Sequence, residues 1–400
     1  MRLLFVTPRF PYPPAKGDQV RCYPQIRELS RRHRVVLLSL AEAPVAADAL
    51  RAMERLCARV EVLPLSRANR ARGIARALAS GRPLQVGAFT HPEARARLQA
   101  LIAAEQIDLV HAVSIRAAEC CLFPKLRPTV VDFIDCLSLN FARRSRLERG
   151  LLRWLCAWEA AQLRRYERRV CAAMDAGLVV SAVDAEALEH PGVRVVPNGV
   201  EVPAAVPRVE TREPFSLAFT GNMNYFPNDD AARFLVREIL PLIWQQVPQA
   251  RAYLVGRNPS PALRRLADGK RVVVTGEVPR VEDYLRRCAV AVCPMRAGSG
   301  MQNKVLEAMA NAAAVVATPF ALGGLTVVPG EHLLVAESAA EFATAVLCLL
   351  GSPERRERLG QAGYRLVRDR CGWAAAVAQT EEVYAAALAA NQSPAPAPGS

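Results

Sequence analysis

The residues that could do chemistry gather between Ala289 and Thr318, where two apolar runs flank a glycine-bearing turn and a short helical segment. The turn is Ala297-Gly298-Ser299-Gly300, and good helix formers occupy Asn303 to Ala310. A glycine turn that leads into a helix presents free backbone N–H groups and the positive end of the helix dipole. Such a turn suits an anion, so the pattern strand, turn, helix, strand predicts a phosphate site.

Three charged side chains accompany this turn. Lys304, one turn into the helix, and Arg296, at the strand end, can each add a positive charge. Glu307 is unfavourable beside a phosphate unless it accepts hydrogen bonds, and the nearby donors in a bound nucleotide are ribose hydroxyls. We therefore expect a nucleotide diphosphate, with its ribose on Glu307. The backbone donors expected for its phosphates belong to Gly300, Met301 and Gln302, and Asn303 is a further donor-binding candidate.

The segment Lys304-Val305-Leu306-Glu307-Ala308-Met309-Ala310, preceded by Gly300 and followed by Ala314-Val315-Val316-Ala317-Thr318, resembles the donor-site signature of retaining glycosyltransferases of the GT-B fold, family 4. The variant with Asn303-Lys304 is similar to exopolysaccharide sugar transferases associated with exosortase (PEP-CTERM) systems. The family usually carries an additional glutamate close to the transferred sugar, and Ser299 stands at that position here. The resemblance thus assigns the catalytic work there to Ser299 or a neighbour, or implies altered donor chemistry.

Length and composition set the class of protein. A chain of 400 residues exceeds what one core usually holds, so two domains are expected. The eleven cysteines form no CxxC or Cys/His ligand spacing, which indicates buried thiols in a reducing cytosol. The apolar start is too short for a signal peptide, and no apolar run is long enough to span a bilayer. We expect a cytoplasmic protein.

Most of the net charge of +14 lies in residues 1–205. Within that half, Arg143 to Arg169 predicts one long helix with Leu151, Trp154 and their neighbours in its middle and arginines at both ends. Such a helix can lie on an anionic membrane surface, or it can be a core helix whose arginines are solvated. Nucleic acid is not expected, because the basic stretch lacks interleaved stacking aromatics and any recognised binding motif.

Apolar runs alternate with helical patterns along the whole chain, which predicts α/β structure with doubly wound parallel sheets. The strands expected in the first half are Arg2–Thr7, Val35–Leu40, Val60–Leu65, Ile107–Val113, Thr129–Ile134, Gly177–Ser181 and Arg194–Pro197. Those expected in the second half are Phe215–Thr220, Arg251–Val255, Arg271–Thr275, Ala289–Pro294, Val315–Thr318 and Leu333–Ala336. Two Rossmann-like domains follow, and the resemblance implies the GT-B fold with a cleft between them.

A turn at Pro197-Asn198-Gly199-Val200, which the family also has at this junction, ends the first domain. We predict an N-terminal acceptor domain at 1–200, a proline-rich linker at 201–214 and a C-terminal donor domain at 215–370. The resemblance implies that a helix at 371–390 crosses back to the first domain. Residues 391–400 are expected to be disordered from their composition.

Further candidates lie at the carboxyl ends of strands in the first half, where open α/β sheets bind ligands. Gly17 can approach a phosphate or merely allow a turn, and Asp18 beside it is assigned to the acceptor side. The family often has a histidine near His111, so this residue is either a catalytic contact or a structural histidine. Asp135 and Ser138 are acceptor-side groups or helix caps.

Strand ends of the second half supply the remaining donor-binding candidates. Many family members have an arginine and a lysine after the strand ending at Thr220, whereas this chain has Gly221 and Asn222. Arg257 follows the next strand. In the family, backbone atoms near the position of Val278 contact the base. No metal constellation occurs, so neither a metal nor a cofactor is expected.

The resemblance implies a metal-independent glycosyltransferase that moves a sugar from a nucleotide diphosphate sugar to a polysaccharide or lipid-linked glycan, with retention of configuration. The departing phosphate would help to take the acceptor proton, so no protein base is demanded. Two alternatives stay open. Ser299 favours a non-catalytic sugar-nucleotide-binding protein of a polysaccharide assembly. A GT-B sugar-nucleotide epimerase would need more cleft carboxylates and histidines than five histidines supply.

Overall fold

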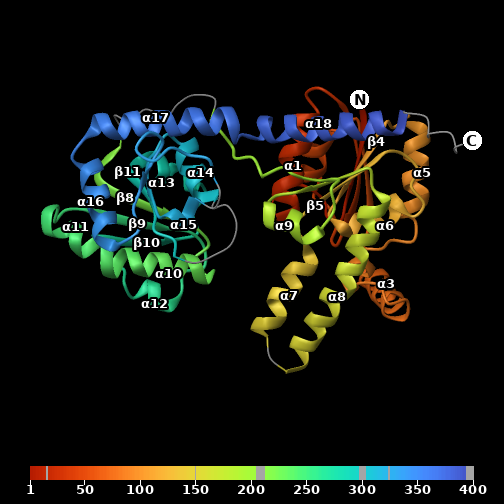
Figure 1. Ribbon diagram of the computed structural model, residues 1–400, viewed down its shortest axis with the longest axis horizontal. Coiled ribbons are helices and arrows are strands. Elements are labelled where there is room, and N and C mark those ends of the chain that lie inside the picture. The colour runs from red at the N-terminus through yellow and green to blue at the C-terminus, as the bar shows by residue number, and fades with distance from the viewer. Residues whose placement is uncertain (15–16, 149, 204–211, 297–302, 323–324, 393–400) are drawn as a thin grey trace, which may run out of the picture. The chain divides into compact units, whose positions relative to one another are not determined.

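The chain folds as two compact units. Unit 1 comprises Met1–Gly199 together with Trp373–Ser400, and unit 2 comprises Val200–Gly372. The structure is a computed structural model that describes residues 1–14, 17–148, 150–203, 212–296, 303–322 and 325–392 (Figure 1). Unit 1 is therefore discontinuous in sequence, because its last helix follows unit 2 along the chain.

Unit 1 is built on a seven-stranded sheet in the order β3-β2-β1-β4-β5-β6-β7, with every pairing parallel. The strands are β1 (Arg2–Thr7), β2 (Arg34–Ala41), β3 (Arg59–Pro64), β4 (Leu109–Val113), β5 (Thr129–Ile134), β6 (Ala176–Val179) and β7 (Val193–Val195). The strand order reverses direction between β1 and β4. Ligands of such sheets bind beyond the carboxyl ends of the strands at this kind of reversal.

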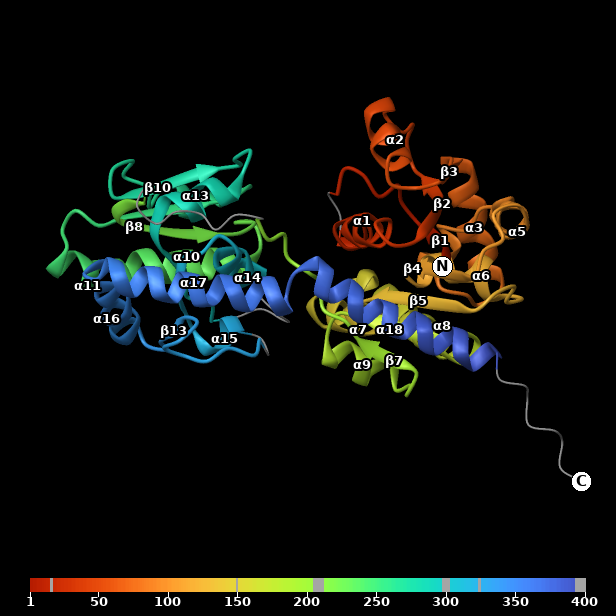
Figure 2. The same ribbon diagram turned by 90° about the horizontal axis from the view of Figure 1, so that it is seen from above.

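Helices cover both faces of this sheet, as a two-residue strand period requires. Leu3 and Phe5 face a core completed by α1 (Gly17–Leu29), α2 (Ala47–Glu54) and α18 (Trp373–Gln392). Leu4 and Val6 face the opposite core, and Figure 2 shows the layers from above. The helices that supply this second core are α4 (Leu84–Gly87), α5 (Ala94–Ala104), α6 (Ile115–Leu122), α8 (Gly150–Ala173) and α9 (Ala182–Leu188).

The predicted single helix from Arg143 to Arg169 is wrong. Two helices, α7 (Leu137–Leu147) and α8, lie side by side as a hairpin that extends from the body of unit 1 (Figure 1). The break has a backbone cause: Glu148 is extended, and Gly150 has φ of +57°, a left-handed conformation in which a right-handed helix cannot continue. The start of α8 is consequently exposed at the hairpin tip rather than in the middle of one helix.

Unit 2 repeats the design with a six-stranded parallel sheet in the order β10-β9-β8-β11-β12-β13. The strands are β8 (Glu213–Thr220), β9 (Arg251–Val255), β10 (Val272–Gly276), β11 (Cys288–Cys293), β12 (Ala314–Ala317) and β13 (Leu334–Val335). The helices include α10 (Phe226–Phe234), α11 (Leu240–Gln246), α13 (Val281–Arg287), α14 (Asn303–Ala310), α16 (Ala339–Leu350) and α17 (Pro353–Arg370). The expectation of two Rossmann-like units with parallel sheets is confirmed.

The predicted linker at 201–214 reaches into unit 2 at its end. Arg212 is buried, and its guanidinium donates hydrogen bonds of 2.6–3.0 Å to the carbonyls of Leu285, Cys288, Asn311 and Ala312. Burial lowers the pKa of Arg212 to about 10. Residues 204–211 of the predicted linker lie outside the described residues. Arg212 thus fastens the start of unit 2 to the ends of α13 and α14.

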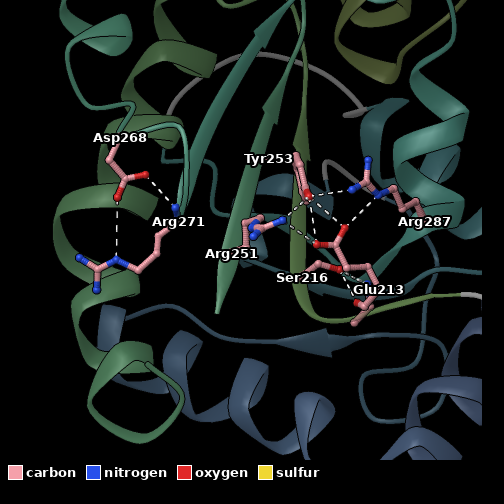
Figure 3. A network of polar contacts seen from close by, with 8 residues as sticks. Glu213, Ser216, Arg251, Tyr253, Asp268, Arg271 and Arg287 are labelled. Carbon is pink, nitrogen blue, oxygen red and sulfur yellow. Dashed lines mark hydrogen bonds and ion pairs between the residues drawn. The ribbon is translucent and has the colours of Figure 1, made fainter. Parts of the chain in front are cut away.

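Glu213, the next residue, anchors the first strand of unit 2 to its neighbours. Figure 3 shows its carboxylate between Arg251, Tyr253 and Arg287. Arg251 Nη1 lies 3.1 Å from Glu213 Oε1, Arg287 Nε lies 2.8 Å from Oε2, and the Tyr253 hydroxyl donates to both oxygens. Both arginines are about half exposed, so these ion pairs contribute modestly to stability and chiefly fix the start of β8.

The last helix returns to unit 1. α18 packs on α1, β5 and β6, and Asn391 with Gln392 extends it past the residue where disorder was expected to begin. Residues 393–400 of that expected tail lie outside the described residues. None of the described helices has both the length and the apolar composition needed to cross a bilayer.

Candidate functional site

A pocket of about 490 Å³ lies at the carboxyl end of the unit 2 sheet. The ends of β8, β9 and β10 and the start of α14 all contribute to it, which places it at the reversal between β8 and β11. Its lining residues are Thr220, Gly221, Asn222, Asn228, Val255, Gly256, Arg257, Glu277, Val278, Val281, Asn303, Lys304 and Glu307. Seven of the predicted donor-binding residues therefore lie in one pocket: Gly221, Asn222, Arg257, Val278, Asn303, Lys304 and Glu307.

Backbone contacts hold the floor of this pocket together. The Gly221 N–H donates to Val255 O at 3.0 Å, and the Met223 N–H donates to Arg257 O at 3.0 Å. A Cβ atom at Gly256, where φ is +151°, would lie only 1.7 Å from Gly221 O. No side chain can occupy that position, so the glycine after β9 lets the two loops pack backbone to backbone.

An asparagine pair supports the loop after β8. Asn228 Nδ2, from the first helix of unit 2, donates a hydrogen bond of 2.9 Å to Asn222 O. Asn228 Oδ1 is buried and has no hydrogen-bond partner among the residues that the structure describes. Because an unmet buried acceptor is costly, this oxygen is a site where a ligand donor would be stabilised.

Helix α14 carries two of the charged groups of the pocket, and the loops after β9 and β10 carry Arg257 and Glu277. Burial lowers the pKa of Lys304, while Cys293 and Glu307 act in the opposite direction. Burial also raises the pKa of Glu307, the nearby charge of Glu282 raises it further, and Lys304 opposes both. Among the described residues, none donates a hydrogen bond to the Glu307 carboxylate, which lines the pocket. A cation and a carboxylate one helical turn apart thus face the same space.

The structure does not bring every predicted donor residue to this pocket. Arg296 is absent from its lining, because its guanidinium lies 2.9 Å from Asp230 Oδ1 and 3.5 Å from Glu238 Oε1 and stacks 4.2 Å over the Phe234 ring. The expectation that Arg296 neutralises phosphates stays a prediction, and in this structure its guanidinium pairs with carboxylates outside the pocket lining. Ser299, Gly300, Met301 and Gln302 lie outside the described residues.

His111 lies inside unit 1 with no exposed surface. Its Nδ1 shares a hydrogen bond of 2.7 Å with the Tyr384 hydroxyl of α18, and its ring stacks on Phe5 at 4.3 Å. Burial lowers the pKa of His111 to about 4, which Asp132 partly opposes. This burial favours the structural alternative, in which the imidazole fastens α18 to the sheet.

The remaining unit 1 candidates lie near the carboxyl edge of its sheet. Asp18, in the first turn of α1, pairs with Arg9 at 2.8 Å. Asp135 accepts a hydrogen bond from Asn140, and burial followed by the charge of Asp184 raises its pKa. Two further predicted residues differ in access: Gly17 is exposed at the start of α1, whereas Ser138 is buried at the start of α7.

Sequence reasoning did not assign six of the pocket residues to donor binding. They are Thr220, Asn228, Val255, Gly256, Glu277 and Val281. A glycine directly after a buried strand was the available signal for Gly256. Within the described ranges, no group of three or more His, Cys, Asp or Glu side chains is arranged to hold a metal ion.

Comparison with known proteins finds a family model that is similar to the part of the chain carrying this pocket. Residues 214–352 match a family model described as glycosyl transferases group 1. A search of curated proteins finds no match for the chain.

Solved structures share the fold of the whole chain. Sucrose-phosphate synthase from Thermosynechococcus elongatus has 17% sequence identity and a TM-score of 0.62, covering 98% of this chain and 100% of that one. HepE from Anabaena, solved in complex with UDP, has 16% identity and a TM-score of 0.61, covering 96% and 100%. TarM, from S. aureus, has 9% identity and a TM-score of 0.64, covering 96% and 99%. The fold is GT-B, and together with the domain match it supports a GT-B glycosyltransferase.

Proposed function

We propose that this protein transfers a sugar from a nucleotide diphosphate sugar to a glycan or lipid-linked acceptor, with retention of configuration and without a metal, in exopolysaccharide biosynthesis. The observation that carries the proposal is the unit 2 pocket, where Lys304 and Glu307 of α14 meet the loops that follow β8, β9 and β10. The group 1 domain match spans these elements. The fold is also that of HepE, whose structures contain UDP and UDP-glucose.

The pocket offers one partner for each part of the nucleotide, namely the diphosphate, the ribose and the base. Lys304 would bind the diphosphate, since a buried ammonium gains most from a charge-assisted hydrogen bond. Glu307 would accept the ribose hydroxyls, which supply the donors that its carboxylate lacks. Val278 would contact the base through its backbone. The cation at Lys304 would stabilise the departing diphosphate, which itself takes the acceptor proton.

Calorimetry tests this assignment. Titration with UDP, GDP and ADP, with and without added Mg²⁺, should show binding of one of them in both conditions. Lys304→Ala and Glu307→Ala should each weaken binding by about 1–3 kcal/mol. Arg296→Met is the matched control, because it removes a nearby cation that pairs with Asp230 outside the pocket. Unchanged affinity in both pocket variants would refute the donor site.

A non-catalytic sugar-nucleotide-binding protein remains the second candidate, because Ser299 replaces the glutamate of the resembled family. Release of nucleotide from the matching nucleotide sugar separates the two. Slow donor hydrolysis, or faster release with a lipid-linked acceptor, supports the transferase. Binding without any release under either condition supports the non-catalytic role.

The proposed function includes peripheral association with an anionic membrane through the tip of the α7–α8 hairpin. Four apolar side chains at the start of α8 are strongly exposed: Leu151 (85%), Leu152 (41%), Trp154 (72%) and Leu155 (47%). Exposed arginines surround them, namely Arg143, Arg144, Arg146 and Arg153. Apolar and aromatic side chains among arginines are the composition that a bilayer interface selects.

The proposed membrane contact lies at the hairpin tip rather than along the whole basic stretch. Arg164 and Arg168, at the other end of the basic stretch, lie 2.8 Å and 3.1 Å from the carboxylate of Glu189. They pair within unit 1, while the apolar residues lie at the hairpin tip. Bilayer contact is therefore proposed for the tip, on the cytoplasmic side of the membrane.

A further inference from the structure

A second pocket, of about 260 Å³, lies in unit 1 and takes no part in the donor site of unit 2. It opens where β1 and β2 end, beneath α5 and α6. Its walls are mainly apolar and include Val6, Leu38, Leu40, Phe89, Ala94 and Ala117. Its volume matches that of about eight or nine water molecules, which is enough for a small ligand.

Two guanidinium groups line this apolar pocket. Arg116 Nη2 donates to Gln85 Oε1 at 2.8 Å, and Arg95 Nη1 donates to Cys120 O at 2.9 Å. Arg116 Nε and Arg95 Nη2 are buried and have no hydrogen-bond partner in the described part of the chain. Each side chain is thus held on one side and unsatisfied on the other.

Neither arginine has a carboxylate partner. Among the described residues, no Asp or Glu oxygen lies within 4.0 Å of Arg95 or Arg116. Glu119 also lines the pocket, but its two oxygens accept hydrogen bonds from Arg82 at 2.8 Å and from the Tyr166 hydroxyl at 2.5 Å. A cation in low-dielectric surroundings without an anion is costly, so an anion from outside would be bound favourably.

The environment of Arg116 supports this conclusion. Its guanidinium lies 5.2 Å from the Phe89 ring centroid, and Arg9 lies 4.9 Å from the same ring. Arg9 is compensated by Asp18 at 2.8 Å and by Glu42 at 3.5 Å. Burial and the charge of Arg9 lower the pKa of Arg116, and Asp18 and other carboxylates oppose this from beyond contact distance. Of the two arginines beside Phe89, Arg9 has carboxylate partners and Arg116 has none among the described residues.

We propose that this pocket binds an amphipathic anion, in which a phosphate or carboxylate contacts Arg95 and Arg116 and an attached apolar chain or ring fills the space beside Phe89. A neutral apolar molecule would leave both guanidinium groups unsatisfied. Inorganic phosphate would leave the apolar walls unfilled. The pocket matches only a ligand that has both parts.

The unit 1 pocket also suggests which acceptor the enzyme uses. If the proposed transferase function holds, a glycan carried on a lipid phosphate combines the anionic and apolar parts that the pocket would bind, so it is the first acceptor to test. The binding proposal itself concerns unit 1 alone and holds whether or not unit 2 turns over a donor.

Calorimetric titration of the full chain with hexyl phosphate, inorganic phosphate and hexanol tests the proposal. Hexyl phosphate should bind at least tenfold more tightly than either of the other two, because it alone engages both parts of the pocket. Equal affinity for hexyl phosphate and inorganic phosphate would overturn the apolar part of the proposal. Equal affinity for hexyl phosphate and hexanol, or no binding of hexyl phosphate, would overturn the anionic part.

Two variants and a matched control locate the site. Arg116→Met should weaken hexyl phosphate binding at least tenfold, and Ala117→Leu should do the same by filling the pocket. Arg70→Met is the control, since Arg70 lies 5.9 Å from the same Phe89 ring but pairs with Glu42 and does not line the pocket. Equal loss in Arg70→Met, or no loss in Arg116→Met and Ala117→Leu, would place binding elsewhere.

Nucleoside diphosphate binding at unit 2, measured on the same samples, separates failure of this inference from failure of the proposed function. Retained nucleotide binding in Arg116→Met and Ala117→Leu would show that unit 2 stays folded in these variants, and hydrogen exchange of unit 1 peptides would show the same for unit 1. If nucleotide binds and hexyl phosphate does not, the unit 1 site fails alone. If hexyl phosphate binds and nucleotide does not, the donor site fails alone.

Discussion

Units 1 and 2 use the same order of parallel strands around a central reversal, yet they differ in the pockets that open at that edge. In unit 2 the pocket floor is backbone, where Gly221 and Gly256 pack closely, and charged groups of both signs line it from α14 and from the loops after β9 and β10. In unit 1 the pocket walls are apolar side chains, with two arginines among them. The shared topology therefore sets where a ligand binds, and the side chains set its chemistry.

The two units also differ in the polar groups that they bury. Unit 1 buries a titratable network in which Arg21 Nε lies 2.6 Å from Asp132 Oδ2, and His111 and Tyr384 lie next to them. Unit 2 buries Arg212 against carbonyl groups alone. Unit 1 should therefore respond to acid through its core, whereas unit 2 should depend on a single cation that stays charged.

The largest effect is expected from Arg212→Met. The substitution leaves the carbonyls of Leu285, Cys288, Asn311 and Ala312 without their buried donor, so unit 2 should lose about 3 kcal/mol or more of stability. Urea denaturation followed by hydrogen exchange of peptides from each unit measures it. Arg265→Met, at an exposed position of unit 2, is the control. Equal stability of the two variants would show that the four hydrogen bonds contribute little.

Acid should destabilise unit 1 through His111. The pKa of His111 is lowered to about 4 in the folded unit. Between pH 6.5 and pH 4 the imidazole is therefore protonated in the unfolded chain and neutral in the folded unit. Stability is then lost as pH falls from 6.5 to 4, by on the order of 3 kcal/mol. His111→Gln should flatten this loss, and Tyr384→Phe, which keeps the imidazole buried, should retain it. The same pH slope in wild type and His111→Gln, by hydrogen exchange in unit 1 peptides, would contradict this prediction.

Glu307→Gln should change the pH dependence of ligand binding in unit 2. The raised pKa of Glu307 means that its carboxylate is neutralised at a higher pH than an ordinary glutamate, so wild-type affinity should fall earlier on acidification. The variant should bind about 1–3 kcal/mol more weakly at pH 7. Its affinity should not change with pH on acidification, because glutamine does not titrate. Calorimetry with the nucleoside, which lacks a titrating phosphate, isolates the effect. Parallel pH profiles in both proteins would remove Glu307 from ribose recognition.

The smallest effects concern the hairpin tip of unit 1. Leu151→Ser and Trp154→Ser should each reduce binding to vesicles rich in phosphatidylglycerol by about 1–2 kcal/mol, because each removes an exposed apolar group. Leu78→Ser, at a singly exposed leucine of α3 (Arg67–Ala79), is the control. Sedimentation with anionic and neutral vesicles measures it. If the parent protein does not bind anionic vesicles, or if all three variants bind as it does, the tip is not a membrane contact.

Much of the fold could be predicted because its strands are continuous apolar runs with clear ends. Pro8 follows β1, and the predicted bounds of β1 and β5 match the structure. The helix break between α7 and α8 was missed although Gly150 marks it, because the flanking residues favour helix on both sides. A helical sequence pattern averages the helix preference of several neighbouring residues. This break instead depends on the backbone conformation of the single residue Gly150.

The unit 2 pocket was easier to predict than the unit 1 pocket for a physical reason. Lys304 and Glu307 are neighbours on one helix, so their spacing alone places them together. Arg95, Arg116 and Phe89 meet only after three separate segments have packed, and nothing in their spacing signals it. Burial likewise decided the roles of His111 and Arg212, and burial is a property of the assembled unit rather than of a segment.

The return of α18 to unit 1 has a consequence for how the chain is made. During translation, residues 1–199 leave the ribosome before α18 exists, so α1 and α2 alone cover the sheet face around Leu3 and Phe5 until all of unit 2 has been synthesised. A fragment that stops before Trp373 should aggregate through that face. A Cβ atom at Gly199 would lie 2.5 Å from the Cα of Trp373, so the two ends of the interruption meet. Excising 200–372 and joining these ends through a short link should yield unit 1 as an independently expressed domain.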